Sequence, residues 1–312
     1  RVRFVAASSA GAIYGSWAAL RKSGVCSQRE MRESSTIDLG STVAGRYRLV
    51  SELARGAAGS VYEAIDEEGG GKAAVKLLHA EYLSDDAMRR RLRREGAVLK
   101  ALSHPAIVRL LELVVDADGL VVLVTELVQG EPLSERLARA PLSSAEADAL
   151  VEALCEGLGA AHAHGVLHGD LKPANVLWSQ GPEGPSVRLV DFSASKILGL
   201  DRLTATGEIS GTPAYMAPEV LTGKSEVDAR IDVYGLGVLL YEALSGTRPF
   251  EDAHVGRLLM KIDAGDCLPL DAVADVKASV AQVVARAMRP EKQERYAGMP
   301  ELLEAWTKAR VG

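Results

Sequence analysis

The sequence predicts an α+β fold of two lobes: a small β-rich lobe with one main helix, followed by a larger and mainly α-helical lobe. Three observations support this prediction. The chain has 312 residues, which is enough for a sizeable core and two lobes. Short runs rich in Val, Leu and Tyr fill the first part of the chain, as β-strands require. Longer stretches with apolar residues at helical spacing fill the second part.

The small lobe is expected over about residues 46–126. Predicted strands cover Tyr47–Leu53, Val61–Ile65, Ala73–Leu78, Leu110–Val115 and Leu120–Thr125. A helix is predicted over Asp85–Leu102, because its leucines recur at helical spacing. The arginine run Arg89–Arg94 goes around more than one face of this helix. A solvated surface is the simpler interpretation of this run, and contact with a phosphate or with another segment of the chain is the alternative.

The large lobe is expected over about residues 130–310. Ser144–His164 is predicted to be a long amphipathic helix, and an apolar helix is predicted over Asp232–Leu244. His162 and His164 resemble a pair of metal ligands. However, no matching carboxylates stand near them in the sequence, so ordinary histidines at a helix end are the simpler interpretation.

The charge of the chain is unevenly spread. The net charge is −6, yet residues 1–44 hold six Lys and Arg against three Asp and Glu. The remaining body is therefore acidic, which argues against nonspecific nucleic-acid binding. Cys26, Cys155 and Cys267 are few, odd in number and far apart. They form neither a disulfide framework nor a metal-ligand spacing, so we expect a reducing compartment and a cytoplasmic protein.

Residues 1–44 are expected to be a disordered leader outside the domain, which would span residues 45–311. The stretch Phe4–Leu20 has basic residues on either side, in the order of a signal peptide, so targeting or membrane contact is the alternative. The stretch is interrupted by Ser and Gly and is short for a membrane span. We therefore expect no membrane contact.

A polar loop at residues 170–175 carries the groups that phosphoryl transfer needs. Two β-prone segments, Val166–Leu167 and Val176–Leu177, flank it and are expected to brace it as short strands. The carboxylate of Asp170 would orient a hydroxyl and accept its proton. The amine of Lys172 would neutralise a phosphate oxygen, and the amide oxygen of Asn175 would hold Mg²⁺. The spacing therefore predicts a phosphotransferase.

A second carboxylate, Asp191, stands at the end of the next apolar run and is followed by Phe192 and Ser193. The series Asp-Leu-Lys-Pro-Ala-Asn at residues 170–175, then Asp-Phe-Ser, resembles the catalytic loop and metal motif of the protein kinase family, in the form typical of Ser/Thr kinases. The likeness is to bacterial members and covers about residues 46–310. It implies a kinase fold that uses ATP and Mg²⁺, with Mn²⁺ as an alternative, and Asn175 and Asp191 as metal ligands.

The loop between the first two strands resembles the nucleotide loop of this family, Gly-x-Gly-x-x-Gly-x-Val, with Ala54 in place of the first Gly. A plain hairpin would explain this loop if it stood alone. The resemblance also implies that Lys76 binds phosphate and pairs with Glu95, and that Thr125 is a small gatekeeper at the adenine pocket. The implied nucleotide contacts are Leu53, Ala54, Gly56, Gly59, Val61, Ala74, Lys76, Thr125, Glu126, Val128 and Leu177.

The stretch Gly211–Glu219 resembles the segment that anchors a peptide substrate in protein kinases. The resemblance implies that Glu219 pairs with Arg295 and that Asp232 tethers the backbone of the catalytic loop. The sequence His-Gly-Asp at residues 168–170 also resembles small-molecule phosphotransferases that act on aminoglycosides or choline. Those enzymes lack the anchor, so a protein substrate with Ser or Thr is favoured.

Three positions depart from the family pattern. Gly169 stands where the family has an Arg that binds a phosphorylated activation segment. We therefore expect a non-RD kinase that depends only weakly on phosphorylation of Thr204 or Thr206. Ser193 and Ala54 replace family glycines, which leaves a pseudokinase or nucleotide-binding scaffold as the alternative. The predicted function is ATP- and Mg²⁺-dependent transfer of the γ-phosphate to Ser/Thr hydroxyls of proteins.

Overall fold

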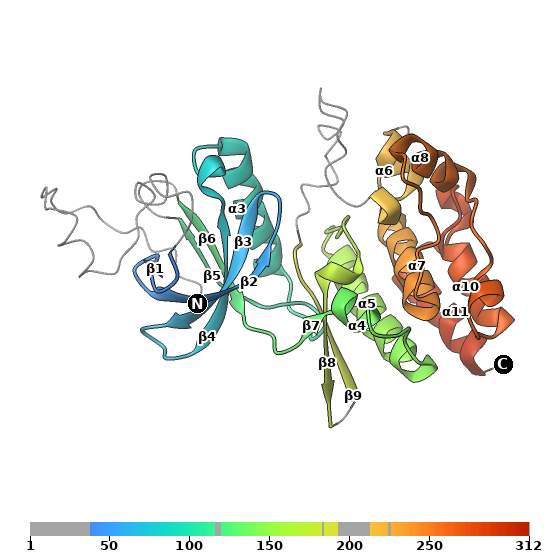
Figure 1. Cartoon of the computed structure of the whole chain (residues 1–312), viewed down its shortest axis with the longest axis horizontal. Coiled ribbons are helices and arrows are strands. Elements are labelled where there is room, and N and C mark those ends of the chain that lie inside the picture. Colours follow the sequence, from blue (N-terminus) through green and yellow to red (C-terminus); the bar gives the residue numbers. More distant parts are fainter. Residues whose placement is uncertain (1–37, 116–119, 183, 193–212, 224–225, 312) are drawn as a thin grey trace, which may run out of the picture. The chain divides into compact units, whose positions relative to one another are not determined.

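The computed structural model describes residues 38–115, 120–182, 184–192, 213–223 and 226–311. These residues divide into two compact units (Figure 1). The smaller unit holds the described residues up to Ala101 and the segment Val108–Val128, and the larger unit holds Leu102–Ile107 and the described residues from Gln129 onward. The α+β class predicted from the sequence is confirmed. Most of the expected leader lies outside the described residues, as do Ser193, Thr204 and Thr206.

The smaller unit is an antiparallel sheet with one long helix, and its strand order is β1-β2-β3-β4-β6-β5. Its elements are β1 (Thr42–Val43), β2 (Tyr47–Arg55), β3 (Gly59–Asp66), β4 (Lys72–Leu78), the 3-10 turn η1 (Ala80–Tyr82), α3 (Asp86–Ala101), β5 (Leu110–Val115) and β6 (Val121–Glu126). The predicted strands and the predicted helix are confirmed, with small shifts at their ends.

Helix α3 packs closely on β5 and β6. Its buried residues include Leu92, Glu95 and Leu99. A Cβ on Gly96 would lie 2.9 Å from Leu113 and 3.1 Å from Leu123, nearer than side chains normally approach. The glycine therefore permits the close contact between helix and sheet.

The larger unit is mainly helical, with one small sheet of order β7-β8-β9. Its strands are β7 (Glu131–Pro132), β8 (Val176–Gly181) and β9 (Gly184–Leu189), and its 3-10 turns are η2 (Pro173–Asn175), η5 (Pro213–Tyr215) and η6 (Lys292–Glu294). Its helices are α4 (Leu133–Leu137), α5 (Ser144–Ala163), α6 (Pro218–Thr222), α7 (Arg230–Ser245), α8 (Val255–Ala264), α9 (Leu270–Val273), α10 (Ala278–Ala287) and α11 (Met299–Val311). Among the described residues, no helix has both the length and the apolar character that crossing a membrane requires.

The core of the larger unit lies around α5 and α7. A capping box starts α5: the Ser143 side chain accepts a hydrogen bond from the Glu146 backbone, and the Glu146 side chain accepts one from the Ser143 backbone. Leu150, Leu154 and Leu158 then recur on the buried face of α5. Helix α7 is buried along almost its whole length. The segment at residues 164–172, which joins α5 to η2, follows directly from this core.

The strand expected at Val166–Leu167 is wrong. Residues 166 and 167 are irregular, and only the second flanking segment is a strand, β8. The backbone N–H of Val166 donates to the carbonyl of Ala161, at 3.0 Å, so this segment completes the end of α5 instead of pairing in a sheet. The end of α5 leaves backbone carbonyls free, and bonding to them outweighed the strand propensity of Val166 and Leu167.

A buried ion pair joins α6 to the segment before α11. Arg295 donates from Nη1 to Oε1 of Glu219 at 2.7 Å and from Nη2 to Oε2 at 2.8 Å. Its remaining donors reach the carbonyls of Arg289, Arg230 and Pro290, at 2.7, 3.1 and 2.7 Å. The side chains of Arg295 and Glu219 are 0% and 7% exposed. The expected pairing of these two residues is therefore confirmed, and all five N–H donors of the guanidinium have an acceptor.

We predict that Arg295→Met lowers the free energy of unfolding of the larger unit by about 3–5 kcal/mol, because Glu219 would remain buried without its counter-ion. Urea unfolding followed by tryptophan fluorescence measures this, since Trp178 and Trp306 are both buried in the larger unit. The control is Arg289→Met, whose side chain is 60% exposed. A loss no greater than that of the control would contradict the role given to this pair.

Candidate active site

In the smaller unit, a lysine and a glutamate form a tight ion pair. Nζ of Lys76, on β4, lies 2.8 and 2.9 Å from the two carboxylate oxygens of Glu95, on α3. The Glu95 side chain is 4% exposed and that of Lys76 is 26% exposed. Because the carboxylate is buried and engaged through both oxygens, it fixes the position of an ammonium that still reaches solvent.

Four of the expected nucleotide contacts share one face of the sheet. Val61 on β3 is paired with Lys76, and Thr125 on β6 is paired with Ala74. Directly paired residues point to the same side of a sheet, as do residues two apart on a strand. Val61, Ala74, Lys76 and Thr125 therefore line one face, whereas Val75 points to the other side and is fully buried.

The loop between β2 and β3 is a tight hairpin. The N–H of Gly56 donates to the carbonyl of Gly59 at 2.8 Å. A Cβ on Gly59 would lie 2.2 Å from the carbonyl oxygen of Leu77, so only glycine fits at this position. Gly56 is less restricted, because its Cβ would meet only the Gly59 oxygen, at 3.5 Å. Ala54 lies at the mouth of the hairpin, where it is paired with Val61 and exposed.

The remaining expected nucleotide contacts are spread over both units. Leu53 on β2 is 48% exposed. Glu126 ends β6, and its N–H donates to the carbonyl of Arg109 at 3.0 Å, so this N–H is already used within the sheet. Val128 is half-buried at the end of the smaller unit. Leu177 belongs to the larger unit, where it lies on β8.

In the larger unit, the structure brings together the three groups of the polar loop. Oδ2 of Asp170 accepts from Nζ of Lys172 at 3.0 Å and from Nδ2 of Asn175 at 2.9 Å. Nδ2 of Asn175 also donates to the backbone carbonyl of Asp170 at 2.7 Å. Asp170 and Asn175 are 7% and 6% exposed. The loop therefore holds a nearly buried carboxylate between an amine and an amide.

A buried carboxylate on α7 holds the backbone of residues 168 and 169, which directly precede this loop. Residues 168–175 together are called the catalytic loop below. Oδ2 and Oδ1 of Asp232 accept from the N–H groups of His168 and Gly169, at 2.9 and 2.8 Å. Nε2 of His162, at the end of α5, lies 2.7 Å from Oδ2 of Asp232. Burial by itself would raise the pKa of Asp232, but the hydrogen bond with His162 contributes to keeping this pKa below its usual value.

The two helix-end histidines serve different purposes. His162 belongs to the Asp232 cluster, whereas Nδ1 of His164 lies 2.9 Å from the carbonyl of Ala160 in the last turn of α5. The contact between His162 and Asp232 was missed in the sequence, because the two residues stand 70 positions apart. A histidine eight residues before Asp170 on a buried helix end was the only available signal.

Asp191 follows β9 with an unusual backbone. Its φ is +61°, a left-handed conformation that Asp adopts more readily than most residues. The N–H of Val190 donates to the carbonyl of Asn175 at 3.0 Å, which brings the backbone beside Asp191 to Asn175. Phe192 is fully buried, and its ring meets the edge of His168 with 4.8 Å between centroids.

Asn175 and Asp191 suit a hard cation such as Mg²⁺. Because Nδ2 of Asn175 donates to Asp170, the amide oxygen points away from these two bonds and is available as a ligand. Within the described ranges, no cluster of three or more His, Cys, Asp or Glu side chains forms a site of its own for a metal. Two protein oxygens are what Mg²⁺ takes when phosphate oxygens and water complete its shell.

A small hollow of about 10 Å³ lies between the catalytic loop and the expected anchor. Its lining includes Asp170, Leu171, Tyr215, Ala217 and Asp232. Tyr215, Met216 and Ala217 of the expected anchor therefore lie beside the loop within the same unit, and Gly211 and Thr212 lie outside the described residues.

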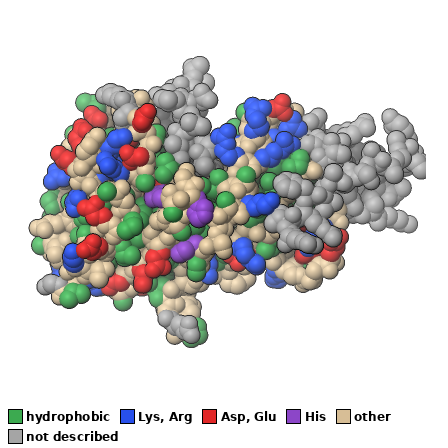
Figure 2. Space-filling view, turned by 180° about the vertical axis from the view of Figure 1, so that it is seen from behind, with side chains coloured by type: hydrophobic (Ala, Val, Ile, Leu, Met, Phe, Trp, Pro, Cys, Tyr) green, Lys and Arg blue, Asp and Glu red, His purple; other side chains and the backbone are tan. Residues whose placement is uncertain are grey.

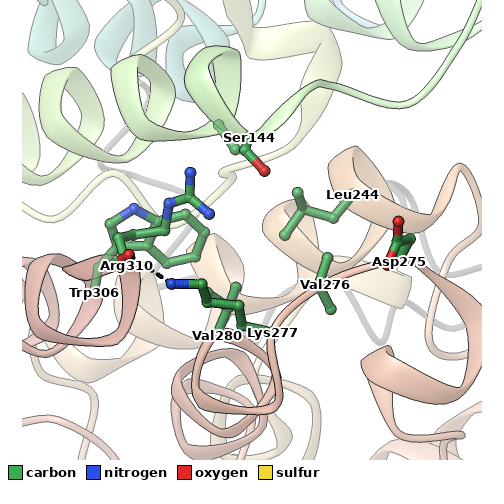
Figure 3. Close-up of a pocket in the computed structure, with 9 residues that line it drawn as sticks. Ser144, Leu244, Asp275, Val276, Lys277, Val280, Trp306 and Arg310 are labelled. Atoms are coloured by element: carbon green, nitrogen blue, oxygen red, sulfur yellow. Dashed lines mark hydrogen bonds between the residues drawn. The ribbon is translucent and has the colours of Figure 1, made fainter. Parts of the chain in front are cut away.

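The larger unit also has a cavity of about 300 Å³ among α5, α7, α10 and α11 (Figure 3). Its lining is Ser144, Ala147, Leu244, Asp275, Val276, Lys277, Val280, Trp306 and Arg310. Nζ of Lys277 donates to the carbonyl of Arg310 at 3.0 Å, and Nε of Arg310 donates to Asp148 at 2.7 Å. None of the expected site residues lines this cavity, so we do not assign it to the active site.

Comparisons with known proteins agree with this geometry. The family model described as protein kinase domain matches residues 47–306. The serine/threonine-protein kinase pkn2 of Myxococcus xanthus is 34% identical over 84% of this chain and 32% of its own length. PkaB of Streptomyces coelicolor is 39% identical over 75% of this chain and 56% of its own length, and PknA of Mycobacterium tuberculosis is 41% identical over 68% and 49%. The chain spans about a third to a half of these curated relatives.

Solved structures give the same result. The crystal structure of the Mycobacterium tuberculosis PknI kinase domain has a TM-score of 0.70 and 27% identity, and the match covers 89% of this chain and 100% of that one. The structure of Rad53 residues 1–466 in complex with AMP-PNP has a TM-score of 0.69 at 24% identity, which supports the fold alone. The chain therefore belongs to the protein kinase family, and its sequence relatives lie among the bacterial serine/threonine kinases.

Proposed function

We propose that this chain transfers the γ-phosphoryl group of ATP to Ser and Thr hydroxyls of protein substrates. The observation that carries the proposal is the cluster in which Asp170 accepts hydrogen bonds from Lys172 and Asn175. A carboxylate held in this way can orient a substrate hydroxyl and accept its proton, while the amine beside it offsets charge on the transferring group. The anchor that packs on the same loop supports a peptide rather than a small molecule as acceptor.

The other groups would bind and orient ATP. Lys76, fixed by Glu95, would contact the α- and β-phosphates, and the backbone of the hairpin at residues 54–61 would approach them where Gly59 leaves room. Mg²⁺, or Mn²⁺ in its place, would neutralise charge on the phosphates when held by Asn175 and Asp191. Within the smaller unit, the adenine would lie against residues 125–128, Ala74, Val61 and Leu53.

We also propose a cytoplasmic location. Cys155 and Cys267 are free thiols, and burial raises the pKa of Cys155 to about 12, which keeps it unreactive. A reducing compartment is compatible with both residues.

Gly169 leads us to propose weak dependence on activation-segment phosphorylation. Its side chain offers no guanidinium to a phosphate, and its backbone has a φ of +69° with the N–H bound to Asp232. The catalytic loop is thus held by the interior of the larger unit. A phosphate on the activation segment would lack its main charge-assisted partner on the loop, and would gain little ordering energy there.

The first prediction concerns the transfer itself. The chain, incubated with Mg²⁺, γ-labelled ATP and a generic basic protein, is expected to place label on Ser and Thr. Asp170→Asn should lower the rate by about 10²–10⁴-fold, because the proton acceptor is lost. Lys76→Met should also abolish label, through loss of the phosphate contact. Asp271→Asn, at an exposed position of α9, is the matched control and should keep full activity.

Phosphoamino-acid analysis separates the outcomes of this experiment. Label on Ser and Thr that disappears in both active-site variants is the expected result. Nucleotide binding without any label would instead favour the scaffold, and would point to Ser193 and Ala54 as the substitutions to revert.

The second prediction concerns the activation segment. The double variant Thr204→Ala/Thr206→Ala should keep its rate within about twofold of the parent, because no arginine at position 169 reads a phosphate there. Steady-state rates of the parent, phosphorylated by incubation with Mg²⁺ and ATP, and of the variant after the same incubation measure this. A collapse of the rate in the variant alone would refute weak dependence.

A further inference from the structure

Helix α3 carries an unusual concentration of positive charge. Its sixteen residues include six basic and two acidic side chains, although the net charge of the whole chain is −6. We call Arg89, Arg90, Arg91, Arg93 and Arg94 the arginine patch. Figure 2 shows Lys and Arg side chains gathered on the surface of the smaller unit, over α3, with few acidic side chains among them. Catalysis as proposed above uses none of these arginines.

The carboxylates near the patch are already engaged. Oδ1 of Asp85 accepts from the backbone N–H groups of Ala87 and Met88 and so caps α3. Asp86 is bonded to Arg89, which is the main cause of its lowered pKa, and Arg90 and Arg93 contribute to the same effect. Glu95 is held by Lys76, as described above.

Among the described residues, three arginines of the patch have no carboxylate partner. In the part of the chain that the structure describes, no hydrogen bond or ion pair joins Arg90, Arg93 or Arg94 to an acidic side chain. Arg90 and Arg94 are exposed and lie four residues apart, where like charges destabilise a helix. Nε of Arg93 is buried and has no acceptor among the described residues. Because this nitrogen is not accessible to an outside partner, Arg90 and Arg94 are the exposed members of the patch.

We propose that the arginine patch is a docking surface for an acidic segment of another protein. Guanidinium groups match carboxylates through paired hydrogen bonds, and a segment rich in Asp and Glu would supply acceptors to the exposed Arg90 and Arg94 together. The patch covers six residues of helix, or about 9 Å, which suits a short peptide segment. A nucleic acid fits less well, because the rest of the chain is acidic and would repel a long polyanion.

The proposal does not depend on the proposed function, because docking requires neither ATP nor turnover. The patch does adjoin the active-site pair, since Arg94 precedes Glu95 on the same helix. A bound segment would therefore hold the helix that positions Glu95.

The test is the fluorescence anisotropy of a labelled oligoglutamate peptide, titrated with the whole chain at low ionic strength and without nucleotide. We expect saturable binding that weakens as salt is added. Arg90→Gln/Arg94→Gln should weaken binding by about tenfold, because two exposed charge pairs are lost. Arg90→Lys/Arg94→Lys keeps the charge but not the paired hydrogen bonds, so its loss should be intermediate.

The matched control removes two exposed cations elsewhere. Arg289→Gln/Lys308→Gln changes side chains that are 60% and 74% exposed in the larger unit, and it should leave binding within about twofold of the parent. Each variant is first shown to melt as the parent does. An equal loss in the control, or no binding by the parent, would overturn the proposal. A single-stranded oligonucleotide that displaces the peptide at a lower concentration than unlabelled peptide does would also overturn it, in favour of a nucleic-acid site.

Discussion

The buried carboxylate of Asp232 is the contact on which the rest of the larger unit's chemistry depends. It lies in the first turn of α7 and is 1% exposed. It joins three parts of the chain: α7 itself, the end of α5 through His162, and the catalytic loop through the N–H groups of His168 and Gly169. A negative charge is favoured at a helix N-terminus, and the three donors offset much of its burial. Asp170 follows directly after this fixed point.

The contact with Asp232 gives a structural reason for glycine at position 169. The loop must turn so that two successive N–H groups face one carboxylate, and the φ of Gly169 is +69°. Glycine adopts this conformation without strain, whereas a residue with a side chain would do so at a cost of about 1 kcal/mol or more. The substitution that removes a phosphate-binding guanidinium therefore also removes backbone strain from the loop. In this chain the loop is held by Asp232, which is buried inside the larger unit.

Much of the site was predictable because its groups stand close together in the sequence. Asp170, Lys172 and Asn175 lie on one short loop, so their spacing alone indicated their convergence, and the structure brings them together. Lys76 and Glu95 were expected to pair because a strand and a helix in that order carry them in related proteins. The Arg295–Glu219 pair was expected on the same basis. In each case a known order of elements supplied the long-range information.

The errors and omissions have a different cause. The Val166–Leu167 strand was predicted from residue preference, but the nearby helix end offered carbonyls to the backbone of that segment. His162 meets Asp232 only because α5 and α7 pack together, and no local pattern reports such packing. The restriction at Gly59, on β3, arises from the carbonyl of Leu77 on the neighbouring strand β4, again a tertiary contact. Local sequence patterns identified the side chains of the candidate site. The contacts that hold these side chains in place depend on how the helices and strands pack.

The measurement that tests the role of Asp232 most directly is the steady-state kinetics of Asp232→Asn beside a melting curve and the affinity for ATP. The amide keeps the size of the side chain, but it replaces one of the two oxygens that accept from the N–H groups of His168 and Gly169 with an NH₂ donor. We predict a kcat lower by about ten- to a hundredfold in a variant that still binds ATP, because the Lys76–Glu95 pair belongs to the other unit. An unchanged kcat in a folded variant would contradict it and show that the loop is held by other contacts.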